Sequence, residues 1–346
     1  MTTEVPGPVP GSISGPVPAS VPAAPASPAS EPALSVPPAP GSPSSSSLSP
    51  AHQYAATRRS GLLATAGLVA TTAVWGSTFL VVKDAIASVP VLDFLGLRFA
   101  LACAAMLAVR PRALAGLGRS GWRHGVLLGL VLAAGYAAQT FGLRTASASV
   151  SGFITGLFVV FTPLIGAVLL RRRVPSAVWV AVALATVGLG LISLHGLSIG
   201  RGELLTVVGA FFFALHIVGL GEWSHRHDAY ALAVVQIGTV AAVSLLLAVI
   251  GHGSRGGHVL TLPPNTAGWA AVAVTALLGT AAGFFLQTWS QARMPATRAA
   301  VVLTMEPVFA GVTGVLAGET LAVRGWIGAA MVLAAMYAVE LGPRRR

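Results

Sequence analysis

The sequence predicts an all-α integral membrane protein of ten transmembrane helices, arranged as two inverted five-helix repeats after a disordered N-terminal tail. Three observations support this fold class. Apolar residues make up 55% of the 346 residues and charged residues only 9%, long apolar runs fill most of the chain, and the second half repeats features of the first. A soluble domain carries roughly 25% charged residues, so one soluble core could not cover this much apolar surface.

Residues 1–57 differ in composition from the rest of the chain. They are rich in Pro, Ser and Ala, and Glu4 and Glu31 are their only charged residues. Without a helical period or an aromatic cluster, little offsets the entropy of ordering such a segment. We therefore predict a disordered cytoplasmic tail, and its repeated prolines interrupt the apolar stretch that a signal peptide needs. An inert extension and a docking segment both fit this composition.

Residues 58–346 contain apolar runs of the length that membrane helices need. Ten helices of about 20 residues with their connecting loops would use roughly this length. Pro, Gly, His, Arg or Asp residues separate the runs. The predicted helices cover 61–82, 91–109, 125–143, 150–170, 177–194, 203–221, 229–250, 268–289, 299–317 and 324–341.

Basic residues are distributed unequally between the two predicted sides of the membrane. With the N-terminus inside, fifteen of the 21 basic residues fall on the inner side and five on the outer side, while Arg98 lies within a helix. Because Lys and Arg favour the cytoplasmic side, we expect a multi-pass protein of the cell membrane with both termini in the cytoplasm. The arginines lie between apolar runs rather than on one basic face, so the net charge of +11 does not indicate a nucleic-acid partner. It does favour contact with anionic membrane lipid.

The two halves of this region, 58–196 and 197–346, resemble each other. Residues 135–141 follow the pattern Gly-aromatic-x-x-Gln-Thr-aromatic, and 283–289 repeat it. Five helices in each repeat force the second copy to enter the membrane in the opposite sense. Inverted repeats of this kind place a substrate site at the membrane midplane and allow access from both sides.

Five short motifs carry a further resemblance. They are Ala73-Val74-Trp75-Gly76-Ser77-Thr78-Phe79, Arg98-Phe99, Phe161-Thr162-Pro163-Leu164, Glu306-Pro307-Val308-Phe309 and Gly318-Glu319-Thr320-Leu321. In this order and spacing, over about 61–341, they resemble the EamA family of the drug/metabolite transporter (DMT) superfamily. The resemblance implies ten helices, a monomeric transporter, and often export of amino acids or other metabolites. The first copy departs from the pattern, because Arg171-Arg172-Arg173 stands where the second copy has Ala317-Gly318-Glu319.

Arg98 and Glu306 are the two charged residues that we place deep inside predicted helices. Ionisable groups at such depth are costly and are candidates for function. Arg98 either receives an acidic group of a substrate or bonds helix-end carbonyls with its head turned outward. Glu306 either loads and releases a proton as access alternates, or serves as a neutral acid bonded to a neighbouring helix.

Pro163 and Pro307 occupy matching positions in the two repeats. Proline removes the hydrogen bond to the carbonyl four residues earlier, here those of Val159 and Leu303. Matched prolines in matched helices favour a pair of hinges over simple kinks.

Five further residues are candidates for substrate binding, namely Trp75, Gln139, His216, Gln236 and Gln287. The four Gln and His side chains can bond a substrate, or equally a neighbouring helix, where such a bond is worth about 1 kcal/mol. Aromatic residues for an amphipathic pocket are Trp75, Tyr136, Phe141, Phe284 and Trp289. We expect no metal and no other cofactor, because the sequence has neither a metal-ligand cluster nor a phosphate-binding loop.

Taken together, these features predict a secondary transporter of small metabolites, amino-acid-like solutes or drugs, that exports them by alternating access. Its expected partners are the small-molecule substrate and membrane lipid. A non-transporting scaffold or receptor would explain the tail but not the duplication. An intramembrane enzyme would need a nucleophile–base pair or a metal cluster, and only His216 and Glu306 fit as acid–base groups.

Overall fold

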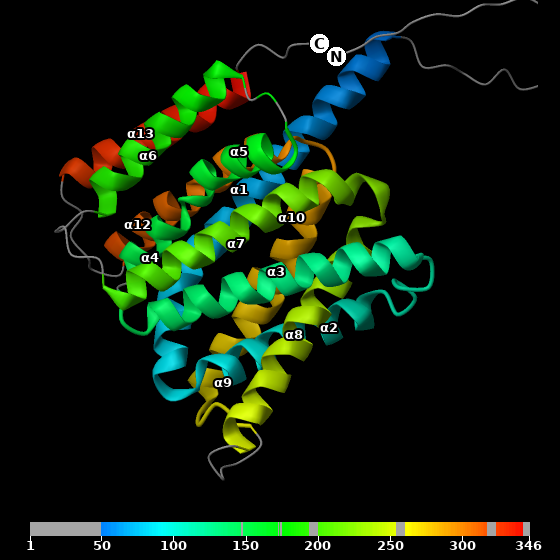
Figure 1. Cartoon of the computed structure of the whole chain (residues 1–346), viewed down its shortest axis with the longest axis vertical. Helices are drawn as coiled ribbons and strands as arrows, with labels where there is room; N and C mark the ends of the chain where they lie inside the picture. Colours follow the sequence, from blue (N-terminus) through cyan, green and yellow to red (C-terminus); the bar gives the residue numbers. More distant parts are fainter. Residues whose placement is uncertain are drawn as a thin grey trace, which may run out of the picture. The chain divides into compact units, whose positions relative to one another are not determined.

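A computed structural model of the chain describes residues 50–146, 148–171, 173, 175–193, 200–253, 260–316 and 323–341. Within these ranges all regular structure is helical, as predicted (Figure 1). The predicted tail lies largely outside the described residues. The first helix begins at Pro50, so it overlaps the predicted end of the tail at 57. Residues 51–59 contain neither Pro nor Gly and include three alanines, so they favour helix.

The helices follow one another in two sets. The first set is α1 (Pro50–Ser88), α2 (Val91–Val109), α3 (Arg119–Leu143), α4 (Ala148–Thr155), α5 (Phe158–Leu169) and α6 (Ser176–Ser193). The second set is α7 (Arg201–Trp223), the 3₁₀ turn η1 (Ser224–Arg226), α8 (Ala229–Gly253), α9 (Thr266–Val274), the π-helix η2 (Thr275–Ala282), α10 (Gly283–Gln291), α11 (Ala296–Leu303), α12 (Met305–Leu316) and α13 (Val323–Leu341).

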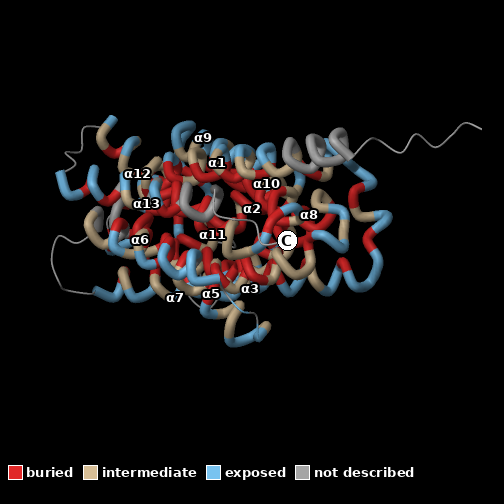
Figure 2. The backbone as a smooth tube through the Cα atoms, turned by 90° about the horizontal axis from the view of Figure 1, so that it is seen from above, coloured by how far each residue is buried: buried red, intermediate tan, exposed pale blue. Residues whose placement is uncertain are grey.

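Many of these segments are suited to a membrane. Eight of the described segments are long and apolar enough to cross one, and Trp179–Gly188 forms a shorter apolar helix. Large apolar side chains such as Leu62, Val168, Leu246 and Val323 are exposed on the outside of the helices. Buried residues fill the interior and exposed residues lie around it (Figure 2). This pattern suits lipid as the surrounding solvent, while the count of ten spans stays a prediction.

Two predicted membrane helices are each broken in the middle. The predicted helix 150–170 divides into α4 and α5 at Gly156 and Leu157, and 299–317 divides into α11 and α12 at Thr304. Pro307 is the third residue of α12, so the N–H that it lacks is one that the first turn of a helix leaves unbonded. Pro163 lies inside α5 instead, beyond the break in the first half.

The predicted helix 268–289 contains a π-helical segment that was not predicted from the sequence. Residues Thr275–Ala282 form a π-helix between α9 and α10. The Thr280 hydroxyl donates to the carbonyl of Thr275, five residues earlier, at 2.9 Å. Such segments are rare and are frequently found at functional sites.

Helix packing follows the duplication of the sequence. In the first set α1 packs against α10 and α12, and in the second set α7 packs against α3 and α5. The equivalent helices α2 and α8 pack against each other, as do α6 and α13 (Figure 1). Exchange of the two sets maps the pairings of α1 onto those of α7 and leaves the α2–α8 and α6–α13 pairings unchanged. The duplication therefore extends from the residue pattern to the helix packing.

Candidate functional site

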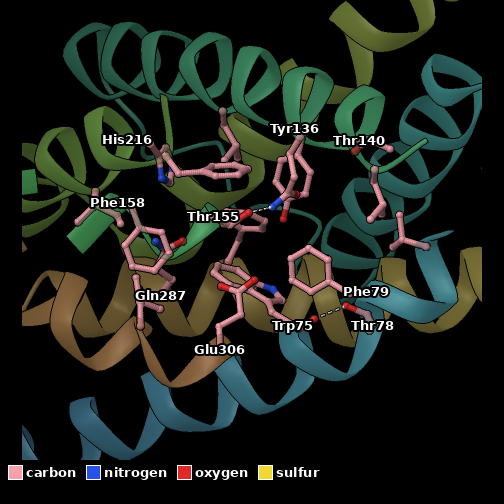
Figure 3. A pocket seen from close by; sticks show the side chains of 18 of the residues that line it. Trp75, Thr78, Phe79, Tyr136, Thr140, Thr155, Phe158, His216, Gln287 and Glu306 are labelled. Carbon is pink, nitrogen blue, oxygen red and sulfur yellow. Dashed lines mark hydrogen bonds between the residues drawn. The ribbon is translucent and has the colours of Figure 1, made fainter. Parts of the chain in front are cut away.

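A central cavity collects most of the predicted site residues from different helices. Its lining includes Trp75 of α1, Arg98 of α2, Gln139 of α3, His216 of α7, Gln287 of α10 and Glu306 of α12. Figure 3 shows Trp75, His216, Gln287 and Glu306 around this space. Both sequence halves contribute, three residues from each.

Aromatic rings form much of the cavity wall. Tyr136 lies edge-on to Phe213, with ring centroids 5.3 Å apart, and Trp75 packs against Phe284 at 5.2 Å. Of the aromatic residues singled out in the sequence, Trp75, Tyr136 and Phe284 line the cavity, whereas Phe141 and Trp289 do not. Phe213 was missed, because its place beside two other phenylalanines gave no indication of which ring faces inward.

Arg98 is held in the cavity wall by fixed contacts. Its Nε donates to the Thr280 hydroxyl at 2.7 Å, and its guanidinium lies 5.2 Å from the centre of the Tyr136 ring. Only 3% of the residue is exposed. Because Thr280 belongs to the π-helix, that segment positions the cation at the cavity.

Trp75 is fixed by the same segment. Its indole N–H donates to the carbonyl of Gly279 at 2.6 Å. A Cβ at Gly279 would come within 3.3 Å of the Arg98 Nη2 atom, so glycine allows this close approach. The π-helix therefore organises two of the predicted site residues.

Glu306 differs from Arg98 in having no partner. Its side chain is 5% exposed, and none of the described residues forms a hydrogen bond or an ion pair with it. It is the second residue of α12, where the positive end of the helix dipole favours an acidic side chain. Arg98 and Glu306 thus share one cavity, where Arg98 has hydrogen-bonded contacts but no carboxylate partner among the described residues, and Glu306 has no bonded partner among them.

Gln236 was predicted to contact substrate but does not line the cavity. It is fully buried and lies behind His216, whose Nε2 is 2.7 Å from the Gln236 Oε1. Pro163 and Pro307 also lie outside the lining. The sequence placed Gln236 in a membrane helix, but the helical period alone could not show which face meets the cavity.

Asp93 is a third buried charge that sequence reasoning missed. Its Oδ2 accepts from His252 Nε2 at 2.8 Å and from the backbone N–H of Thr261 at 3.1 Å. Asp93 begins an apolar run, so the sequence indicated a helix start rather than a buried group. Only its distant partner His252, 159 residues later, explains the burial.

No cofactor site is evident in the part of the chain that the structure describes. There, no three His, Cys, Asp or Glu side chains are grouped as metal ligands would be. The side chains that line the cavity offer one cation, one carboxyl group, amides, an imidazole and aromatic walls.

Comparison with known proteins agrees with this arrangement. The sequence matches the EamA-like transporter family twice, over residues 62–194 and 200–341. An uncharacterised transporter of Archaeoglobus fulgidus is 30% identical over 283 residues, which are 81% of this chain and 86% of that protein. A protein of known crystal structure shares the fold, with a TM-score of 0.65 and 18% identity over 80% of this chain and 96% of the other.

The two family matches cover both halves of the duplication and nearly all of the membrane region. Together with the apolar helices, they identify a multi-pass membrane transporter for small molecules, and the chain belongs to the EamA-like transporter family.

Proposed function

We propose that this protein is a secondary active transporter that binds an amino-acid-like metabolite in the central cavity and exports it by alternating access. One observation carries the proposal: Arg98 and Glu306 line the same cavity, between aromatic walls, and neither has an ion-pair partner among the described residues. A buried charge without a partner is costly, so the site is suited to a ligand that brings the missing charges.

A zwitterion with an apolar side group fits these surroundings. The Arg98 Nε is engaged by Thr280 and its guanidinium also interacts with Tyr136, so a carboxylate would bind the remaining N–H groups. An ammonium group complements Glu306, and an apolar side group packs against rings such as Phe284. The amphipathic solute would thereby replace contacts that it loses on leaving water.

Proton coupling is assigned to Glu306, and movement to the helix breaks of both halves. Glu306 takes up a proton when no ammonium group is present and releases it to the side that the cavity faces, which links transport to a proton gradient. The breaks between α4 and α5 and between α11 and α12 give each half a flexible point. Pro163 and Pro307 act as hinges next to these breaks, and the inverted entry of the halves lets one movement close one side while it opens the other.

A counterflow screen tests the function. Purified full-length protein in proteoliposomes would be preloaded with single amino acids, amines or drugs, and entry of the labelled solute would be measured. We expect counterflow for solutes with both a carboxylate and an ammonium group, and its loss in Arg98→Gln. No counterflow for any solute of the panel, with correctly inserted protein, would contradict the proposal.

A further inference from the structure

The amide of Gln287 is oriented by a chain of hydrogen bonds that ends on the backbone. Gln291 Nε2 donates to the carbonyl of Ile217 at 2.8 Å, and Gln287 Nε2 donates to Gln291 Oε1 at 3.1 Å. A carbonyl can only accept, so the direction of both bonds is fixed by chemistry. Gln287 Oε1 is left buried, without a partner among the described residues, on a side chain that lines the cavity.

The repeat-related residue Gln139 is oriented in the same sense by a different chain. Its Nε2 donates to the Thr155 hydroxyl at 2.8 Å, as the dashed line in Figure 3 shows. That hydroxyl in turn donates to the carbonyl of Ser151 at 2.8 Å. Because Thr155 has only one hydrogen to give, it must accept from Gln139, whose Oε1 is left for a ligand.

His216 adds a third acceptor. Gln236 Nε2 donates to the carbonyl of Leu232 at 3.0 Å, so its Oε1 accepts from His216 Nε2. In the neutral imidazole the other nitrogen, Nδ1, then carries no hydrogen and is an acceptor. Gln139, Gln287 and His216 thus each present one acceptor atom that these hydrogen bonds leave unused.

Three hydrogen-bond donors around the cavity are already used within the protein. The Trp75 indole donates to Gly279, the Thr78 hydroxyl to the carbonyl of Trp75, and Thr155 to Ser151. These three groups therefore do not satisfy the free amide oxygens of Gln139 and Gln287, which are available to a ligand group that supplies hydrogens.

We infer that the acceptors Gln139 and Gln287 select solutes whose ammonium group carries N–H hydrogens, and discriminate against the N-methylated counterparts. Gln291 and Thr155 are positioning residues, because they touch the two glutamines and hold their amides. The inference rests on the proposed function, since it concerns the same cavity. It differs from recognition by the aromatic walls, which would bind a quaternary ammonium through its charge alone.

Phenylalanine and its N,N,N-trimethyl betaine are suitable probes, since they share the carboxylate and the ring and differ in the N–H groups. Their dissociation constants would be measured by calorimetry on the full-length protein in lipid nanodiscs. Hydrogen bonds to a charged group are worth about 1.5–3 kcal/mol, so we expect phenylalanine to bind at least about tenfold more tightly than the betaine.

Variants separate positioning from general stability. Gln287→Met keeps the length of the side chain and removes the acceptor, so it should weaken phenylalanine about tenfold and leave the betaine unchanged. Gln291→Leu should reduce the preference for phenylalanine in the wild-type background and have no further effect on it in Gln287→Met. Ser290→Ala, buried on the same helix and outside the cavity lining, is the matched control and should change neither constant.

Gln139 and Thr155 offer an independent pair of positions in the first repeat. If an α10 variant does not fold, Gln139→Met and Thr155→Val should give the same results on α3 and α4. Equal affinity of the wild type for both probes, binding of neither, or a preference that survives Gln287→Met and Gln139→Met together, would overturn the inference. If one of these binding results occurs but the counterflow screen finds a transported solute, the inference fails and the proposed function still stands. If the screen finds no transported solute, the proposed function fails, whatever the two dissociation constants are.

Discussion

At the scale of single residues, the two charges of the cavity differ in how they are held. Arg98 has the Thr280 hydroxyl on one side and the Tyr136 ring on another. Glu306 is equally buried but has no bonded partner among the described residues. A charge held by fixed partners keeps its state, whereas an unpartnered carboxyl group responds to whatever enters the cavity. Arg98 is therefore suited to binding and Glu306 to coupling.

Replacement of Glu306 by Gln tests the coupling. A charged side chain at membrane depth costs about 2.5–3.5 kcal/mol on insertion scales. Protonation of Glu306 removes this cost, so the residue can change its protonation state as access changes sides. Gln keeps the shape but cannot titrate. We expect Glu306→Gln to insert normally and exchange solute, but to lose accumulation driven by a pH gradient in proteoliposomes. Gradient-driven accumulation equal to that of the wild type would eliminate the proton-carrier role.

Four of the cavity residues could be predicted from the sequence for one physical reason. Polar or charged groups within apolar runs are few because they are costly, and Arg98, Gln139, Gln287 and Glu306 are such groups. The sequence did not distinguish Gln236, because an amide that meets the cavity and one that bonds a neighbouring helix satisfy the same rule. Only the three-dimensional contact with His216 separates the two cases.

At the scale of helices, the site depends on departures from regular α-helix. The break before Met305 places Glu306 in the first turn of a helix, and the π-helix presents the Gly279 carbonyl to Trp75. Pro307 gave a sequence signal for the first of these. The π-helix gave none, because the partner of its carbonyl lies 204 residues away in the chain. Local pattern thus predicted where helices lie, but not where they widen.

Helix α1 packs closely on α12 at Gly76. A Cβ at Gly76 would lie 2.5 Å from the carbonyl oxygen of Glu306 and 2.8 Å from the backbone nitrogen of Ala310. Backbone atoms cannot move aside as a side chain end can, so we expect Gly76→Ala to lower the free energy of unfolding by about 1–3 kcal/mol. Gly311→Ala, on α12 with nothing within 4 Å, is the control and should be near neutral. Thermal unfolding in detergent measures both, and equal midpoints would refute the close contact.

Asp228 joins the end of α2 to the start of α8. Both its carboxylate oxygens lie 3.0 Å from Arg110 Nη1, and Oδ1 also accepts from the backbone N–H of Ala231 at 2.8 Å. Partial burial raises the pKa of Asp228, but the Ala231 and Arg110 bonds outweigh it, so the pKa lies below its usual 3.8. A carboxyl group with a lowered folded-state pKa stabilises the fold above its unfolded pKa, and this contribution is lost as pH falls through the folded value.

Two substitutions of Asp228 separate the cap from the ion pair. Asn caps a helix about as well as Asp, so Asp228→Asn should lose only the exposed pair, while Asp228→Ala should cost about 1 kcal/mol more. Below about pH 4, the Asn variant should lose less stability than the wild type does. Unfolding midpoints between pH 3 and pH 7 measure this difference, and parallel curves for wild type and Asn would show that the pair contributes nothing.

At the scale of the whole molecule, residues from separate loops meet at two ends of the fold. Arg110, His225, His227, Asp228 and Arg293 line one crevice, although they follow or precede different helices. At other positions, Lys83 donates to the carbonyl of Ala146, and Asp93 bonds His252 and Thr261. The first group falls on the side that the sequence predicts as inner and the second on the predicted outer side. Loops that the charge pattern places on one side of the membrane therefore also contact each other in the structure.

The charge pattern and the loop contacts together predict the orientation of the protein in the membrane. Fifteen of the 21 basic residues belong to the side of the Arg110 crevice by the predicted topology. Lys and Arg near helix ends are retained on the cytoplasmic side during insertion. A reporter fused after Arg346 should therefore report a cytoplasmic position, and one inserted beside Arg255 should report an external position. The pair controls for expression, because each fusion carries the same reporter on the same chain. Opposite signals at the two positions would reverse the orientation and, with it, the assignment of the transport direction as export.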